Sequence, residues 1–220
     1  MIEQIEIRNL LPCVFAGMED TDRIRSSQIW EEPSFVFHRG CRLCVHAESG
    51  NGKSSLLHFI YGSRKDYKGS ILFDGTDISA LSIVQWCDVR TKGIALLPQD
   101  MALFPELTVG QNIDLKNNMT HHKTSEQIKD LLARLGIDDK HDVAAGKLSI
   151  GQMQRVALVR AVCQPFDFIF LDEPVSHLDA RNNKIVADII TEEANSQGAG
   201  IISTSVGNHL MLDNAKFVSL

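Results

Sequence analysis

Glycines, serines and a lysine are clustered between residues 47 and 55 in a pattern that suits phosphate binding. The segment reads Ala47-Glu48-Ser49-Gly50-Asn51-Gly52-Lys53-Ser54-Ser55. Glycines let backbone N–H groups approach phosphate oxygens, and the dipole of a helix that starts beside them favours negative charge. Apolar residues at helical spacing follow Lys53, and Gly62 would end that helix. This pattern predicts a phosphate-binding loop.

Each residue of this loop has a predicted role toward a nucleoside triphosphate. The residues expected to surround the phosphates are Ser49, Gly50, Asn51, Gly52, Lys53, Ser54 and Ser55. Lys53 would reach the β- and γ-phosphates, Ser54 would give its hydroxyl to Mg²⁺, and Ser55 could touch the α-phosphate. The general pattern has glycine where this chain has Ala47, but alanine fits wherever φ is negative. We therefore expect ATP and Mg²⁺ as ligands.

Two acidic residues, Asp172 and Glu173, follow the apolar run Phe168–Leu171. Asp172 could hold Mg²⁺ through water, and Glu173 could align the water that attacks the γ-phosphate. The simpler interpretation is an acidic strand end that leads into Pro174. A phosphate loop in the same chain favours the catalytic interpretation.

The elements that must position these residues can be predicted from apolar patterns. Buried parallel strands are indicated by four short apolar runs, at 43–45, 94–97, 168–171 and 201–202. Ligands bind beyond the carboxyl ends of such strands, where residues 49–54, Gln99, Asp172, Glu173 and Ser205 would meet. Alternating apolar residues at 2–7, 35–37 and 71–73 predict antiparallel strands.

Residues 100–164 lack comparable strand patterns and are predicted to form a helical lobe. Thr124 and Gln127 match a capping box ahead of an apolar face that ends at Gly136. Ser149 and Gln152 match a second capping box. The helix after Thr124 is expected to bury its apolar face in the core of the lobe.

Composition narrows the class of protein. The chain has 220 residues and 44% hydrophobic content, enough for one sizeable core. A net charge of -6 argues against nucleic acid as a partner. No apolar run reaches the roughly 18–20 residues that cross a bilayer, so we expect a cytoplasmic chain. The five cysteines, including Cys41 and Cys44 in a C-x-x-C spacing, are expected to be reduced structural thiols, since that pair falls on a strand.

The segment Leu148–Arg155 resembles the signature motif of ABC ATPases. The resemblance extends to Leu97-Pro98-Gln99, which is similar to the family's Q-loop, and to Ser176–Asp179, which is similar to its D-loop. It implies an α/β fold with a P-loop NTPase core built on a parallel-containing sheet, an antiparallel β subdomain and a helical subdomain. Residues 1–220 would form a single ABC ATPase domain, with the helical subdomain, approximately 100–164, inserted between the Q-loop and the Walker B strand that ends at Asp172.

The resemblance also implies a head-to-tail dimer, in which each ATP lies between the phosphate loop of one subunit and the signature helix of the other. The residues that would contact ATP across this interface are Ser149, Gly151, Gln152 and Asp179. Gln99 would take part in catalysis and in holding the metal. An aromatic residue after the first strand would stack on adenine; Phe15 is the candidate, with ordinary burial as the alternative, and Trp30 is a second.

Two positions depart from the family pattern. Ile150 stands where the signature has its first glycine, and Ser205 stands where the family has a switch histidine. Loss of one transition-state donor costs on the order of 10² to 10³ in rate. We therefore expect slow but real hydrolysis, with Ser205 as the catalytic residue at this position. His209, four positions later, could substitute, or could be an ordinary surface or core histidine.

These observations lead to an expected function. The chain resembles the ATP-binding subunit of a membrane ABC transporter, which would lie on the inner face of the cell membrane and power a separate permease. A second ATPase subunit would complete the dimer, with a homodimer favoured over a heterodimer. Two alternatives remain open: a non-transport ABC ATPase, for example of a division-type complex, and a nucleotide switch with impaired hydrolysis.

Overall fold

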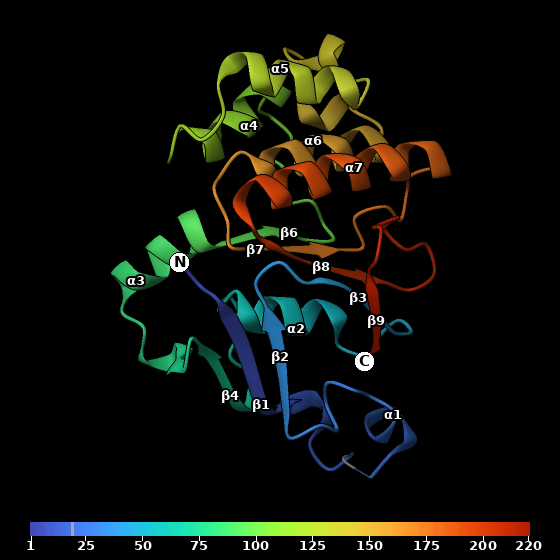
Figure 1. Ribbon diagram of the computed structural model, residues 1–220. Helices are drawn as coiled ribbons and strands as arrows, with labels where there is room; N and C mark the ends of the chain where they lie inside the picture. Colours follow the sequence, from blue (N-terminus) through green and yellow to red (C-terminus); the bar gives the residue numbers. More distant parts are fainter. Residues whose placement is uncertain (19) are drawn as a thin grey trace.

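The computed structural model describes residues 1–18 and 20–220, which build two sheets and a layer of helices (Figure 1). The antiparallel sheet has the order β2-β1-β4-β5. Its strands are β1 (Gln4–Pro12), β2 (Ser34–His38), β4 (Tyr67–Phe73) and β5 (Thr76–Asp77). Ile5 of β1 pairs with Phe37 on one side and Phe73 on the other. The alternating pattern thus places one apolar face of this sheet toward the core.

The second sheet is parallel, with the order β6-β7-β8-β3-β9. Its strands are β3 (Arg42–His46), β6 (Ile94–Leu97), β7 (Phe168–Asp172), β8 (Gly200–Ser205) and β9 (Lys216–Ser219). All five residues of β7 are buried, because helices or the other sheet cover both faces. The four parallel strands predicted from apolar runs are confirmed, whereas β9 was not predicted.

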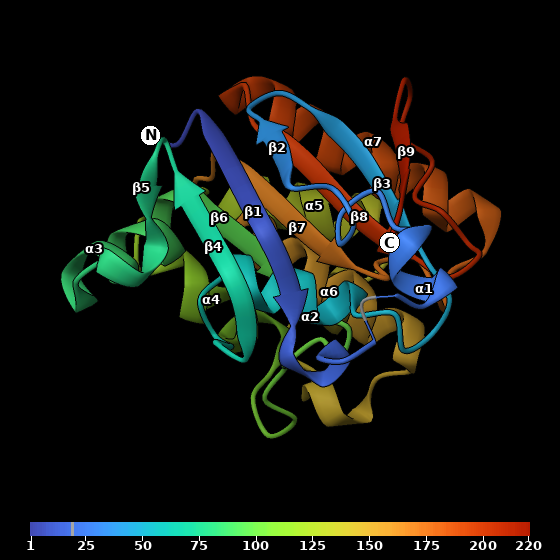
Figure 2. The ribbon, with the colours of Figure 1, turned by 90° about the horizontal axis from the view of Figure 1, so that it is seen from below.

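Helix α2 (Lys53–Ile60) lies between the two sheets (Figure 1). In Figure 2 the antiparallel sheet is in front, and the parallel strands run behind it. Leu56, Leu57 and Phe59 of α2 are fully buried in the core that both sheets share. Since α2 contacts both sheets, the start of this helix is fixed at the edge where the parallel strands end.

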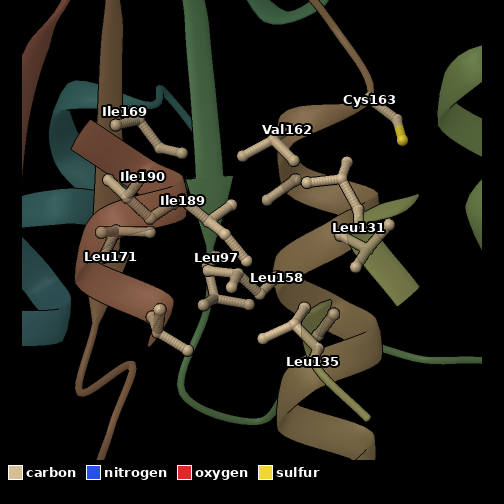
Figure 3. Packing of buried hydrophobic residues seen from close by; sticks show 14 of the residues in the cluster. Leu97, Leu131, Leu135, Leu158, Val162, Cys163, Ile169, Leu171, Ile189 and Ile190 are labelled. Atoms are coloured by element: carbon tan, nitrogen blue, oxygen red, sulfur yellow. The ribbon is translucent and has the colours of Figure 1, made fainter. Parts of the chain in front are cut away.

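Helices cover the other face of the parallel sheet. Leu158 and Val162 of α6 (Ile150–Val162) and Ile189 of α7 (Ala180–Gln197) pack toward β6 and β7, as Figure 3 shows. Leu131 of α5 (Ser125–Arg134) extends this core into the helical region. This cluster joins the sheet to the helices that follow β6.

Residues 98–167, between β6 and β7, contain helices α4 (Val109–Asn117), α5 and α6. The predicted capping boxes at Thr124 and Ser149 are present, and a third begins α4 at Thr108. The remaining α-helices are α1 (Asp22–Arg25) and α3 (Ile83–Asp88). Short turns of 3-10 or π helix are at Cys13–Phe15, Ile78–Ala80, Val89–Gly93, Asp138–Lys140 and Ala145–Lys147. Within residues 1–18 and 20–220, no helix is both long and apolar enough to span a bilayer.

Candidate active site

The phosphate loop connects β3 to α2 and rests on aromatic side chains. Gly50 and Gly52 have φ angles of 85° and 94°, which glycine adopts without strain. A Cβ at Gly52 would lie 3.2 Å from the Trp30 ring, and the Trp30 Nε1–H donates to the Asn51 carbonyl at 3.2 Å. Ala47 is outside the left-handed region, which explains why alanine is accepted there. The Trp30 side chain therefore holds the phosphate loop at Asn51 and Gly52.

Lys53 lies inside the loop and is only 5% exposed. Its ammonium donates to the carbonyls of Ala47, at 2.9 Å, and Glu48, at 3.1 Å, and lies 3.9 Å from Glu173 Oε1. Burial lowers the pKa of Lys53, and the charges of Glu173 and Asp172 partly oppose that shift. A partly desolvated cation is thus held where phosphate charge would arrive.

Asp172 is 2% exposed at the end of β7. Its Oδ1 accepts from the Thr204 hydroxyl at 2.7 Å, while its Oδ2 is buried without a hydrogen-bond partner among the described residues. Ser54, Gln99 and Asp172 line one cavity of about 400 Å³, together with His58, Pro98 and Asp100. An unpartnered carboxylate oxygen beside a hydroxyl and an amide is a donor set that suits Mg²⁺. The residues present therefore fit the metal.

Glu173 is held in an unusual backbone conformation, with φ of 49°. Its N–H donates to Thr204 Oγ1 at 3.1 Å, and its carbonyl accepts from Gln154 Nε2 at 3.0 Å and from the Ser176 hydroxyl at 3.1 Å. Strained backbone of this kind persists only when its surroundings fix it, and it is concentrated at functional sites. Gln154, on the signature helix, was not predicted from the sequence, where nothing distinguishes it from a surface glutamine.

Lys53 and Glu173 both line a second cavity, of about 200 Å³. Its lining consists of Val14, Phe15, Ser49, Gly50, Gly52, Lys53, Ser54, Ser55, Gln99 and Glu173. The structure thus brings together the Q-loop glutamine, the predicted catalytic acid and the predicted loop residues other than Asn51, which lines a different cavity. It adds Val14, for which the sequence carried no signal.

Phe15 lines this cavity, but its ring is only 4% exposed and approaches Gly52, where a Cβ would lie 3.5 Å from it. Trp30 is buried to a similar extent. By contrast, Val14, which lines the same cavity, is 70% exposed. This arrangement favours the alternative that Phe15 is a core residue, because a stacked base needs an open ring face.

Ser205 lies at the end of β8 and is 1% exposed. Its hydroxyl is 2.5 Å from His209 Nδ1 and 3.6 Å from Cys44 Sγ. It is not among the described residues that line the cavity at Lys53. In this structure the Ser205 hydroxyl therefore contacts His209 and Cys44, and its role as the residue at the switch position stays a prediction. Burial and the neighbouring His46 lower the pKa of His209, which favours the neutral ring in this contact.

The signature residues lie at the start of α6. Ser149 caps this helix by accepting from the Gln152 N–H at 3.3 Å, and a Cβ at Gly151 would lie 3.4 Å from the His177 carbonyl. Asp179 caps α7 by accepting from the Asn182 N–H at 2.8 Å, a contact that lowers its pKa. Among the described residues, the lining of the cavity at Lys53 includes none of Ser149, Gly151, Gln152 and Asp179. The start of α6 and the start of α7 are therefore separate from this cavity within one chain.

Comparison with known proteins identifies a matching family and similar sequences. The model of a family described as ABC transporter matches residues 30–176. The chain is 30% identical over 173 residues to the ABC transporter ATP-binding protein YtrE of Bacillus subtilis (strain 168), with 77% of this chain and 75% of that protein covered. It is 28% identical over 179 residues to the lipoprotein-releasing system ATP-binding protein LolD of Shewanella denitrificans, covering 80% of this chain and 77% of LolD.

Solved structures share the fold. The dimeric structure of MJ0796, described as a bacterial ABC transporter cassette, superposes with a TM-score of 0.73 at 19% identity, covering 98% of this chain and 94% of that one. A bacterial Atm1-family ABC exporter with ATP bound gives a TM-score of 0.71 at 22% identity, covering 99% of this chain and 37% of the exporter. The two sheets and the helical region are therefore those of an ATP-binding cassette.

Proposed function

The chain belongs to the ABC transporter family, and from this premise we propose that it is an ATP-hydrolysing subunit that drives a separate membrane permease. The family membership supports ATP binding and hydrolysis. The observation that carries the proposal is the juxtaposition of buried Lys53 with the Glu173 carboxylate, 3.9 Å away, in the cavity at the phosphate loop. A charged pair of this kind in a cavity, with a lysine whose pKa burial lowers, is typical of a functional site.

The residues of this cavity, together with Asp172 from the neighbouring cavity, would act in each step of hydrolysis. Backbone N–H groups of the loop and the Lys53 ammonium would bind the phosphates. Ser54, Gln99 and Asp172 would hold Mg²⁺, which when bound neutralises charge on the β- and γ-phosphates. Glu173 would align the attacking water and accept its proton.

A second copy of the chain would complete the site. The residues Ser149, Gly151, Gln152 and Asp179 form the start of α6 and the start of α7, where backbone N–H groups and the helix dipole favour a phosphate. In a head-to-tail dimer they would cover the γ-phosphate of the partner. We place the dimer on the cytoplasmic face of the cell membrane, with the helical subdomain, approximately residues 100–164, toward the permease.

One observation favours a competing function, a nucleotide switch with impaired hydrolysis. Ser205 is buried against His209 and Cys44, so its hydroxyl is engaged away from the cavity at Lys53. Single-turnover release of phosphate from bound Mg-ATP separates the two functions. A measurable rate that Glu173→Gln abolishes supports the ATPase, whereas no release from the wild type supports the switch.

The transporter assignment is tested by capturing the partner. Glu173→Gln is purified by affinity from gently solubilised membranes with Mg-ATP, because this variant should bind ATP without hydrolysing it and hold the closed dimer. Lys53→Met, which should not hold the phosphates, serves as the matched control. A multi-span protein recovered with the first variant and not the second supports the transporter. Recovery of soluble partners alone, or of none, contradicts it.

A further inference from the structure

The side chain of Arg64 is fixed beside the phosphate loop by three neighbours. Its Nε donates to Asp66 Oδ1 at 3.0 Å, and its Nη2 donates to Asp66 Oδ2. The remaining terminal nitrogen, Nη1, donates to the Ser55 hydroxyl at 2.8 Å. The guanidinium carbon lies 5.3 Å from the centre of the buried Phe59 ring. A bidentate pair and an aromatic contact thus aim the last nitrogen at Ser55.

Ser55 belongs to the lining of the nucleotide cavity, near the start of α2. A hydroxyl has two lone pairs and one proton. Because Arg64 donates to the Ser55 oxygen, the hydroxyl proton is directed elsewhere and can be donated to a further acceptor. A charged donor also strengthens the hydroxyl as a donor in turn. The pair therefore forms a polarised donor at the edge of the cavity.

The backbone that follows Arg64 is hydrogen-bonded to the segment that leads into Val14, one of the residues that line the cavity. The Asp66 carbonyl accepts from the Cys13 N–H at 2.9 Å, and Tyr67 pairs with Pro12. Val14, which directly follows Cys13, lines the cavity together with Ser55. The guanidinium thus lies at the part of the cavity that is lined by Val14, Phe15 and Ser55.

We propose that Arg64 is a nucleotide-binding residue of this chain: its guanidinium, held by Asp66, orients the Ser55 hydroxyl and adds positive charge toward the α-phosphate. The proposal rests on the proposed function, since it needs a nucleotide in the cavity. The α-phosphate is common to ATP and ADP, so Arg64 stabilises both complexes to the same extent. It does not act on the γ-phosphate, so it leaves the hydrolytic step unchanged.

A stabilising surface ion pair is the competing explanation for these contacts. Arg64 and Asp66 are about half exposed, with relative side-chain exposures of 43% and 50%, and such pairs contribute little to stability. The chain offers a matched pair of this kind. Arg8 makes the same bidentate contact with Glu6, also two positions away, on β1. Arg8 touches no residue of the cavity lining in these contacts, so it separates the two explanations.

The test compares Arg64→Met with Arg8→Met in the full chain. Calorimetric titration with Mg-ADP gives the Kd, and steady-state hydrolysis gives KM and kcat for ATP. We expect Arg64→Met to raise the Kd for ADP by about 5- to 30-fold, as loss of a charge-assisted contact at a partly exposed site would do. KM for ATP rises with it, while kcat changes less than about twofold. Arg8→Met binds ADP like the wild type.

The contact with Ser55 is tested by a double-mutant cycle. If Arg64 acts through the hydroxyl, Ser55→Ala combined with Arg64→Met weakens ADP binding by less than the product of the two single effects. Full independence of the two effects overturns that part of the proposal. Arg64→Lys keeps the charge without the fork that pairs with Asp66, so we expect partial recovery of affinity.

Three results are decisive for Arg64 as a whole. An unchanged Kd for ADP in Arg64→Met overturns the proposal, and so does an equal loss of affinity in Arg8→Met. If Arg64→Met does not fold, as judged by its circular dichroism, Arg64→Gln, which also removes the charge, replaces it, and a Kd equal to that of the wild type overturns the proposal. A wild type that binds neither ADP nor ATP would refute the proposed function itself, which is a different outcome.

Discussion

The carboxylate of Asp172 contributes differently to function and to stability. Its Oδ2 is buried without a partner among the described residues, and its Oδ1 accepts from Thr204. An unpaired buried carboxylate oxygen costs free energy in the absence of a metal. We expect Asp172→Asn, without ligands, to be as stable as the wild type or more stable by up to about 2 kcal/mol. The same variant should need at least about tenfold more Mg²⁺ for half-maximal ATPase activity.

Thermal unfolding and a Mg²⁺ titration of phosphate release measure these two effects. Thr204→Val is the control, because it removes the partner of Oδ1 and leaves the charge in place, so it should unfold earlier than the wild type. If Asp172→Asn unfolds earlier and keeps the wild-type dependence on Mg²⁺, then Asp172 stabilises the fold and does not hold the metal.

The five cysteines allow a residue-scale test of the expectation that they are structural thiols. Burial raises the pKa of Cys41 to about 11 and that of Cys163 to about 12, and it also raises the pKa of the buried Cys44. At pH 8 a pKa of about 11 leaves about one thiol in a thousand as the reactive thiolate. We expect iodoacetamide to modify only the exposed Cys13 and Cys87 in the folded chain.

Mass spectrometry after brief alkylation checks this prediction, and alkylation in denaturant provides the control in which all five thiols react. Because these pKa values are raised, the folded chain should become more reactive at its buried cysteines only well above pH 9. Only Cys44 of the C-x-x-C pair lies in a strand, since Cys41 directly precedes β3. Rapid modification of Cys41 at pH 8 would show that the chain just before β3 opens.

At this scale, the sequence predicted best the residues that stand beyond the ends of predicted parallel strands. Lys53 follows β3, and Asp172 and Glu173 stand at the end of β7, so these side chains meet at one edge of the sheet. The sequence was less informative about Phe15 and Ser205. The direction of each of these side chains depends on what packs against it from distant segments, Gly52 for Phe15 and Cys44 for Ser205.

Helix α2 joins the phosphate loop to the core. Neighbouring residues restrict the backbone and the space for a side chain at the end of this helix as well as at its start. Gly62 follows α2 with φ of 71°, and a Cβ there would lie 2.3 Å from the ring of Trp86. That ring also contacts Arg90, whose guanidinium is 4.9 Å from the ring centre, and Phe73. A side chain at position 62 must therefore displace a ring that is held from both sides.

Gly136 ends α5 in the same way, with φ of 62°, but a Cβ there meets nothing within 4 Å. Both glycines carry the same conformational requirement, about 1 kcal/mol for an alanine. We expect Gly136→Ala to lose about 1 kcal/mol of unfolding free energy, and Gly62→Ala to lose a further 1–3 kcal/mol from overpacking. Denaturant titrations of both variants measure the difference. Equal losses would show that Trp86 moves aside without cost.

Helices with capping signals were predictable at this scale, since the hydrogen bonds that begin them are local. Thr124 and Ser149 both form the boxes that their sequences indicated. Strand β9 was not predicted. It is a short edge strand in which Lys216 and Phe217 are exposed, so it lacks the continuous apolar run of a central strand. Its pairing with β3 is a long-range contact, which no local pattern reveals.

At the scale of the whole molecule, the proposed site is divided between two distant parts of the chain. Among the described residues, the lining of the cavity at Lys53 includes none from the start of α6. Under the proposed function, one subunit would therefore give its phosphate loop to one site and the start of its α6 to the other. In a head-to-tail dimer with two-fold symmetry, each ATP would contact both subunits. This arrangement makes a prediction about mixtures of inactive variants.

Two variants disable different halves of the site. Lys53→Met removes the cation of the phosphate loop. Ile150→Glu places a negative charge at the start of α6, where Ile150 is 51% exposed and packs against no core, so the fold should tolerate it. Each variant alone should lose most ATPase activity. In a heterodimer, the loop of the Ile150→Glu subunit faces the intact signature of the Lys53→Met subunit, so one of the two sites is fully wild type.

In an equal mixture half of the dimers are heterodimers, so random pairing should restore up to about a quarter of wild-type activity. When dimers are dilute, ATPase activity should depend on the square of the protein concentration. A third variant carries Lys53→Met and Ile150→Glu in one chain. It should restore no activity when it is mixed with either single variant. This double variant tests whether a single variant regains activity only because a second subunit stabilises its fold. If the two single variants do not complement each other at any ratio, hydrolysis occurs within one chain, and the residues at the start of α6 bind no partner's ATP.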